Sequence, residues 1–207
     1  MSAVWVDTDF GFDDLWALLL LQKIGCPVAG VSLVAGNTPL AQVAANAVGS
    51  KAAYGFDWPV WRGAARPLKR AQETAQRILG ATGMRSRGVR LPDVETDPPP
   101  EGAVDAMGAW LAAHSDGKAE LLSLGPLTNV AILLQRFPDA IDRLERIVWM
   151  GGSAGAGNHT SLAEFNALAD PEALAVVLES EVPFDIVDLV FVAGSPLAQM
   201  TCRNWTR

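Results

Sequence analysis

The chain has 207 residues, half of them hydrophobic and 19% charged, which is typical of a globular protein with one domain and a substantial core. A formal net charge of −7 argues against nucleic acid or an anionic membrane surface as a partner. Two cysteines exclude a disulfide framework, and the absence of a signal-type stretch before Asp7 or of an apolar run that could span a bilayer favours a cytoplasmic protein.

Four carboxylates fall within eight residues near the N-terminus, at Asp7, Asp9, Asp13 and Asp14. They separate a short β-prone run at 3–6 from a long apolar run at 15–21, so the pattern predicts a strand, a loop and a helix. A tight turn at Gly11 would let acids before and after it face one point. Close carboxylates repel each other unless a cation lies between them, and oxygen-rich clusters suit Ca²⁺ or Mg²⁺. Helix capping explains one or two of these acids, so a metal site is the favoured interpretation for the cluster.

The rest of the chain alternates predicted strands with predicted helices. The strands are expected at 28–35, 59–62, 119–124, 146–150 and 183–192. Helices are expected at 39–54, 102–114 and 171–179, the last with Asp170 as its N-cap. A further helix is expected to start at the break 125–129 and to run through residue 136. Residues 63–100 show no regular pattern and are expected to be irregular, either a functional loop or a disordered one. This alternation predicts one α/β domain over residues 1–207, with an open, mostly parallel, Rossmann-like sheet covered by helices on both faces.

Further polar residues follow these predicted strands. Asn37 follows the second strand, and the loop 151–166 carries Asn158, Glu164 and Asn166. Because the carboxyl ends of parallel strands meet at one edge of the sheet, we expect these residues to converge with the aspartates. Carboxylates and amides around a cation would hold a polyol such as a sugar. The alternatives are a turn or cap role for Asn37 and an ordinary surface position for Asn158.

Taken together, these motifs resemble one family. Residues 7–14, DTDFGFDD, resemble the DTDxGxDD signature of the nucleoside N-ribohydrolases, the inosine-uridine preferring nucleoside hydrolases. Matching segments follow in family order at 36–38 (GNT), 124–129 (LGPLTN), 150–152 (MGG) and 158–173, which contains EFN and DPEA. The resemblance extends from residue 4 to about residue 190, and five linked motifs make it specific.

The resemblance implies Ca²⁺-dependent hydrolysis of the N-glycosidic bond of ribonucleosides, giving ribose and free base. It implies that the Ca²⁺ ligands are Asp9, Asp14 and the backbone carbonyl of Leu124. Asp9 would also be the general base that takes a proton from a metal-bound water, and Asn37 would be a second catalytic residue. The residues implied to bind ribose are Asp13, Asn158, Glu164 and Asn166. A homo-oligomer, either a dimer or a tetramer, is also implied.

The sequence departs from the family pattern in its last part. Family members are usually longer, and their C-terminal part supplies a further Asp and often a His, whereas no acid or His follows Gly194 here. Leu79 stands where a loop His is usual, and His159 matches no family role. Three interpretations stay open: a shortened family member that still binds Ca²⁺ and ribose but hydrolyses poorly, an inactive fragment of a full-length hydrolase, and a non-catalytic protein that binds nucleosides or ribose. Metal binding is expected to be weaker than in the longer family members.

Overall fold

The structure is a computed structural model that describes residues 3–84, 88, 90–114 and 119–194. Within these residues one sheet has six strands in the order β3-β2-β1-β4-β5-β6, and every pairing is parallel. The strands are β1 (Val4–Thr8), β2 (Val28–Leu33), β3 (Val60–Arg62), β4 (Ala119–Ser123), β5 (Leu144–Met150) and β6 (Phe184–Val187). The predicted open parallel α/β sheet is therefore confirmed.

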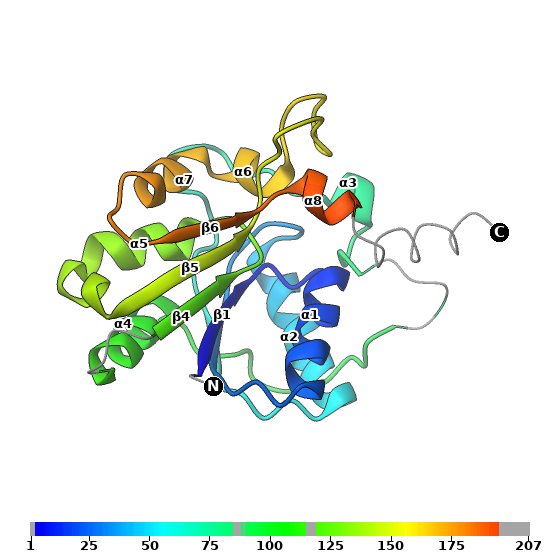
Figure 1. Cartoon of the computed structure of the whole chain (residues 1–207). Helices are drawn as coiled ribbons and strands as arrows, with labels where there is room; N and C mark the ends of the chain where they lie inside the picture. Colours follow the sequence, from blue (N-terminus) through cyan, green and yellow to red (C-terminus); the bar gives the residue numbers. More distant parts are fainter. Residues whose placement is uncertain (1–2, 85–87, 89, 115–118, 195–207) are drawn as a thin grey trace.

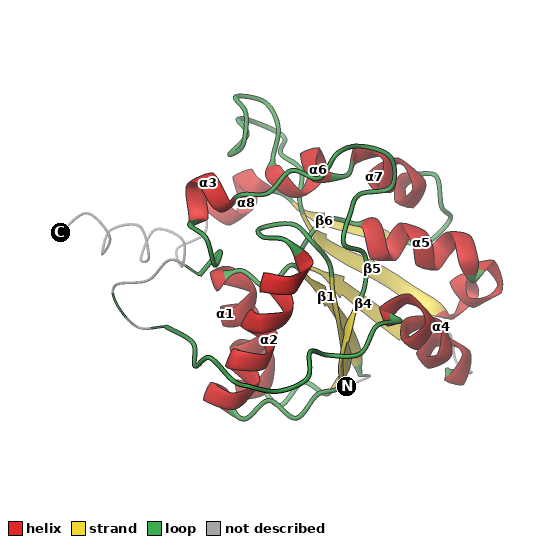
Figure 2. Cartoon of the chain, turned by 180° about the vertical axis from the view of Figure 1, so that it is seen from behind, coloured by secondary structure: helices red, strands yellow, loops and turns green. Residues whose placement is uncertain are grey.

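Helices cover both faces of this sheet, as the sequence predicts (Figures 1 and 2). On one face lie α1 (Phe12–Lys23) and α2 (Leu40–Tyr54). On the other lie α4 (Ala103–Ala113), α5 (Thr128–Arg136) and α7 (Pro171–Leu178). Because successive side chains of a strand point to opposite faces, Trp5 and Val6 enter different cores. Trp5 packs in the core under α4 and α5, and Val6 packs in the core under α1 and α2.

The strand order places a topological switch point between β1 and β4. From β1 the chain adds β2 and β3 on one side, and from β4 it adds β5 and β6 on the other. Ligands of open α/β sheets bind at the carboxyl ends of such strands. The two ends touch here, because a Cβ at Gly125, after β4, would lie 3.0 Å from the backbone nitrogen of Asp9, after β1. Glycine at position 125 is what permits this approach.

One predicted strand is wrong in its second half. Strand β6 ends at Val187, and residues 189–192 belong to the helix α8 (Leu189–Gly194) instead of the strand predicted at 183–192. The Asp188 carboxylate starts this helix by accepting the backbone N–H of Phe191 at 2.8 Å, and it also accepts the N–H of Ala154 at 2.9 Å. The apolar sequence at 189–192 suits a strand equally well, so the capping contact decides the outcome.

Short elements that the sequence did not predict complete the fold. They are the helix α3 (Gln76–Leu79) inside the irregular region 63–100, the 3₁₀ helix η1 (Pro138–Arg143) and the helix α6 (Phe165–Ala169). No helix among the described residues combines the length and apolar character needed to cross a bilayer.

Candidate active site

Asp9 directly follows β1 at the switch point, and only 1% of its surface is exposed. Its Oδ2 accepts the backbone N–H of Asn37 at 2.6 Å, so the turn after β2 holds the carboxylate. A Cβ at Gly36 would collide with this carboxylate, and glycine is therefore required there. Burial, followed by the negative charge of Asp14, holds the pKa of Asp9 well above its usual value.

Thr8 organises the turn between β1 and α1. Its Oγ1 accepts the backbone N–H of Phe10 at 2.9 Å and donates to Asp14 Oδ1 at 2.7 Å. Phe10 has a left-handed backbone with φ = 45°, a conformation that is rare for an aromatic residue and concentrates at functional sites. The strained residue turns the chain so that the carboxylates on both sides of it come together.

Asp14 is buried at the start of α1 and lies close to Asp9. Its Oδ2 accepts the backbone N–H of Gly11 at 2.7 Å, so the capping interpretation is confirmed for this residue. Burial, followed by the charge of Asp13, raises the pKa of Asp14 to about 7. A Cβ at Gly11 would lie 2.9 Å from Asp13 Oδ1, 3.0 Å from Asp14 Oδ2 and closer still to the amide of Asn37. The predicted residues Asp9, Asp13, Asp14 and Asn37 therefore do converge.

Asp7, the remaining acid of the cluster of four, does not join this group. Strand alternation places it on the face of Trp5, where its carboxylate accepts hydrogen bonds from Ser32 Oγ and, at 2.8 Å, from Asn129 Nδ2. Burial raises the pKa of Asp7 to about 6. Its second oxygen, Oδ2, is buried and has no hydrogen-bond partner among the residues that the structure describes.

Asn166 and Glu164 lie at the ends of β4 and β5. Asn166 Nδ2 donates to the backbone carbonyls of Leu124 and Met150, each at 3.0 Å, and so links the two strand ends. The Glu164 carboxylate caps α6 by accepting the N–H groups of Asn166 at 2.8 Å and Ala167 at 3.0 Å. It also accepts the N–H of Gly152 at 2.8 Å, which fixes the start of the glycine-rich loop. These local bonds hold both predicted ribose-binding residues in place.

Asn158 belongs to the same loop but is exposed. Its Oδ1 accepts the backbone N–H of Phe165 at 2.9 Å, which ties it to the start of α6. The structure thus places the predicted residues in two groups. Asp13, Asp14 and Asn37 surround Gly11, and Asp9 is joined to them by the backbone N–H of Asn37. Leu124, Glu164 and Asn166 adjoin the ends of β4 and β5, and Asn158 lies in the loop that follows β5.

The chemistry of the predicted Ca²⁺ ligands fits such an ion. Asp9, Asp14 and the carbonyl of Leu124 are oxygen donors, which Ca²⁺ prefers, and the two buried carboxylates raise each other's energy when no cation is between them. Within the described ranges, no group of three or more acidic, histidine or cysteine side chains is arranged to hold a metal on its own. Backbone carbonyls and water would have to complete the coordination.

Sequence reasoning missed Thr8 and Asn129, which hold the acids in place. Thr8 could have been found from its position before a predicted helix, since a hydroxyl there commonly accepts a backbone N–H two residues on. Asn129 offered no such local signal, because its partners are Asp7, Leu33 and Ala64, all more than 60 residues away.

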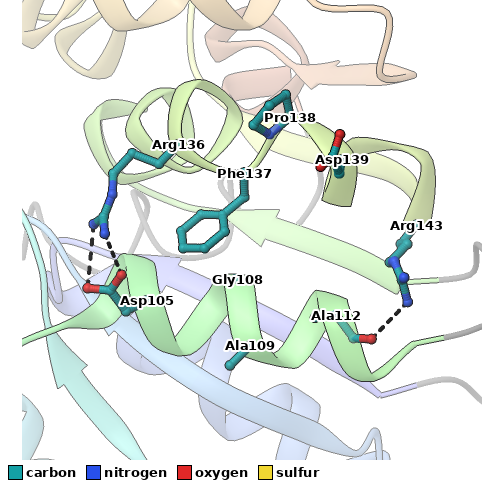
Figure 3. A pocket seen from close by; sticks show the side chains of 9 residues that line it. All are labelled: Asp105, Gly108, Ala109, Ala112, Arg136, Phe137, Pro138, Asp139 and Arg143. Atoms are coloured by element: carbon teal, nitrogen blue, oxygen red, sulfur yellow. Dashed lines mark hydrogen bonds and ion pairs between the residues drawn. The ribbon is translucent and has the colours of Figure 1, made fainter.

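A surface hollow of about 410 Å³ lies elsewhere, between α4 and the segment that joins α5 to η1 (Figure 3). Arg136 at its rim is paired with Asp105 at 2.6 Å, and Arg143 donates to the carbonyl of Ala112 at 2.8 Å. Because these guanidinium groups are already bound to the protein, the carboxyl edge of the sheet is the better candidate site.

Comparison with known proteins shows which proteins this chain resembles. The family model described as inosine-uridine preferring nucleoside hydrolase matches residues 4–206. A non-specific ribonucleoside hydrolase, RihC, of Klebsiella pneumoniae is 34% identical over 209 residues, covering 97% of this chain and 67% of the relative. An uncharacterized protein of Schizosaccharomyces pombe is 39% identical over 198 residues, covering 91% of this chain and 59% of the relative.

Solved structures of nucleoside hydrolases share the fold. An inosine-guanosine nucleoside hydrolase superposes with a TM-score of 0.80 at 31% identity, covering 90% of this chain and 59% of the other. The plant nucleoside hydrolase PpNRh1 superposes with a TM-score of 0.79 at 26% identity, covering 91% of this chain and 60% of the other. The chain thus spans about three fifths of the length of several proteins that it matches. On its sequence and its fold, the chain belongs to the inosine-uridine preferring nucleoside hydrolase family.

Proposed function

We propose that this chain hydrolyses the N-glycosidic bond of ribonucleosides and releases ribose and a free base, with Ca²⁺ held by Asp9, Asp14 and the carbonyl of Leu124. One observation carries the proposal: two buried carboxylates, Asp9 and Asp14, meet at the switch point between β1 and β4. Buried carboxylates that repel each other are destabilising, and a bound cation would remove that penalty. Family membership supplies the reaction class.

Asp9 is the proposed general base. The Asn37 amide fixes one of its oxygens, so the carboxylate has a defined orientation toward an attacking water. Bound Ca²⁺ would lower the pKa of that water and hold it in place. The positive charge that develops on the ribose ring would be stabilised by the carboxylates around it, as in glycoside hydrolysis generally.

Ribose recognition is assigned to the exposed carboxylate of Asp13 and to the residues after β5. Glu164 accepts three backbone N–H groups, and a carboxylate has about four lone-pair sites, so one site remains for a sugar hydroxyl. The amides of Asn158 and Asn166 can donate or accept with the other hydroxyls. These roles are proposals that rest on the position of the residues and on the family.

The test is a ribose-release assay with inosine and with uridine, in Ca²⁺ and in a chelator. Asp9→Asn, prepared in the same way, excludes a contaminating hydrolase, and Asp93→Asn, an exposed position, controls for the loss of one charge. Release that requires both Ca²⁺ and Asp9 would support the proposal. No release, combined with a rise in Tm on adding ribose and Ca²⁺, would instead support the alternative of a non-catalytic binding protein.

Two further expectations go with this proposal. A dimer or tetramer would be seen by sedimentation of the purified chain, and a cytoplasmic location would be seen by fractionation of its native cells.

A further inference from the structure

Two segments at the carboxyl edge are joined by a contact that has no part in the proposed chemistry. His159 Nε2 lies 2.6 Å from Glu73 Oε1, and the two residues are 86 positions apart in the sequence. Only 9% of the His159 side chain is exposed, whereas Glu73 is largely open to solvent. The imidazole also packs against the ring of Phe165, with 5.2 Å between the ring centroids. The imidazole is thus largely covered by protein, although its neighbours Asn158 and Thr160 are exposed.

Each of the two segments is bonded to a residue of the candidate site. Near Glu73, the backbone N–H of Ala75 donates to the carbonyl of Asn37 at 3.1 Å. Next to His159, the side chain of Asn158 accepts the N–H of Phe165. A small apolar cluster of Ala75, Leu79, Phe165 and Ala169 lies beneath the contact. The pair therefore connects the side of the site that contains Asn37 to the side that contains Asn158.

The turn that carries His159 is held together mainly by its own bonds. The N–H of His159 donates to the carbonyl of Ala163 at 3.2 Å, and the hydroxyl of Thr160 accepts the N–H of Ala163 at 2.9 Å. A Cβ at Gly157 would collide with the backbone of Ala163, so the turn is closely folded on itself. A contact from the middle of this closely folded turn to another segment therefore constrains the orientation of the turn.

We propose that His159 and Glu73 form a latch that holds the turn 157–163 against the segment 73–79, which makes His159 a positioning residue for ribose binding through Asn158. When His159 is protonated, the contact is a charge-assisted hydrogen bond, which is stronger than a neutral one. This inference rests on the proposed function, because it assigns the latch to the ribose side of the same site. Since Asn158 would hold the sugar in the ground state and in the transition state alike, losing the latch weakens binding without slowing the chemical step.

The test uses three variants and two matched controls. His159→Phe keeps the ring on Phe165 but removes the hydrogen bond, His159→Gln keeps a donor, and Glu73→Gln removes the acceptor charge. His114→Phe is the control for the first change, since His114 also packs on an aromatic ring, Trp110, but lies at the end of α4. Glu101→Gln is the control for Glu73→Gln, since Glu101 is also an exposed carboxylate and is paired with Arg62.

Two measurements are made on each protein: hydrogen exchange of the peptides that cover 73–84 and 152–164, and the KM and kcat of ribose release. For His159→Phe and Glu73→Gln we expect faster exchange in both segments. We also expect KM to rise about three- to ten-fold at unchanged kcat, since one lost hydrogen bond weakens binding by about that factor. We expect His159→Gln to recover most of the KM and both controls to match the unaltered protein. Unchanged exchange and KM in His159→Phe would overturn the latch.

Failure of the proposed function gives a different result. If the unaltered protein releases no ribose, exchange still decides whether the latch exists, and the ribose-induced rise in Tm in Ca²⁺ replaces KM. A smaller rise in His159→Phe than in His114→Phe would support the positioning role. An equal rise, or none in any of the proteins, would overturn that role even if exchange shows that the latch forms.

Discussion

The backbone N–H of Asn37 donates to a carboxylate oxygen of Asp9 across 2.6 Å, which fastens the turn after β2 to the end of β1. Asn37 therefore orients the proposed base through its main chain, while its side-chain amide lies over Gly11 beside the other acids. From the sequence alone, Asn37 could be a turn former or an active-site residue, and the two roles could not be distinguished. In the structure its main chain and its side chain make separate contacts. The backbone contact fits a turn former, and a role of Asn37 in the chemistry stays a prediction.

Replacement of the proposed base gives the first prediction. Asp9→Asn should lower ribose release by about a hundred- to ten-thousand-fold, the usual contribution of general base catalysis. The fold should remain, because an amide oxygen can still accept the Asn37 N–H, and Tm without Ca²⁺ should stay equal or rise because the repulsion with Asp14 is gone. Ribose assays and thermal unfolding check both parts. Asn37→Ala, which keeps the backbone N–H, should lose less activity, and a loss as large as that of Asp9→Asn would contradict the main-chain role.

The second prediction concerns pH. Burial raises the pKa of Asp7 to about 6 and that of Asp14 to about 7, and the pKa of Asp9 is raised as well. An unfolded aspartate titrates near 3.9, so between about pH 4 and pH 7 the folded chain binds more protons than the unfolded chain. Without Ca²⁺ the free energy of unfolding should therefore fall as the pH rises through this window.

Calcium should reverse this trend, because a cation favours the ionised carboxylates. Thermal unfolding at pH 5 and pH 7.5, in chelator and in Ca²⁺, measures both effects, and the rise in Tm with Ca²⁺ should be larger at pH 7.5. Asp14→Asn should flatten the pH dependence seen in chelator. A metal-free protein that becomes more stable from pH 5 to pH 7 would show that these carboxylates do not titrate as described.

Local patterns in the sequence predicted the frame of the fold well. The Asp170-Pro171 pair predicts the start of α7, and the Asp170 carboxylate does cap it by accepting the N–H of Ala173 at 3.0 Å. The strand-to-helix turn at 7–14 and its place at the carboxyl edge were also predictable, because they follow from apolar runs and from the geometry of parallel sheets. These features depend on neighbouring residues alone.

Features that depend on distant partners could not be predicted. Asp188 starts α8 where an apolar run favours a strand, and it does so with help from Ala154. The Glu73 contact of His159 joins residues that no local pattern relates. Asp7 is a further case, because period-two alternation puts Trp5, Asp7 and Asp9 on one face and so cannot separate Asp7 from the site; its bonds to Ser32 and Asn129, far away in the sequence, do so.

The third prediction compares two helix caps. Glu164 and Asp170 are both buried, and each carboxylate accepts three hydrogen bonds. Glu164→Ala and Asp170→Ala should each lower the free energy of unfolding by about 1–3 kcal/mol, since caps and buried acceptors are lost. Only Glu164→Ala should also raise the KM for nucleoside, because Glu164 adjoins the site. Urea unfolding and steady-state kinetics distinguish the two, and an equal effect on KM would indicate that Glu164 has a structural role alone.

The fourth prediction concerns the buried link between Asn129 and Asp7. Asn129 Nδ2 donates to Asp7 Oδ1 at 2.8 Å and to the carbonyl of Leu33 at 3.1 Å, and its Oδ1 accepts the N–H of Ala64 at 2.8 Å. Asn129→Ala would leave a buried carboxylate without one of its donors, so the free energy of unfolding should fall by about 2–4 kcal/mol at pH 7.5. The loss should be smaller at pH 5, below the pKa of about 6, where Asp7 is protonated in the folded chain.

A double-mutant cycle with Asp7→Asn isolates the part of this loss that comes from the charge. In the Asp7→Asn background, Asn129→Ala removes a hydrogen bond between neutral groups, which is weaker than one to a carboxylate. Asn129→Ala should therefore lower the free energy of unfolding by less in that background. Urea unfolding of the four proteins at pH 7.5 gives the coupling free energy directly. A coupling near zero would mean that Asn129 stabilises the fold through Leu33 and Ala64, and that Asp7 is tolerated in the core without its help.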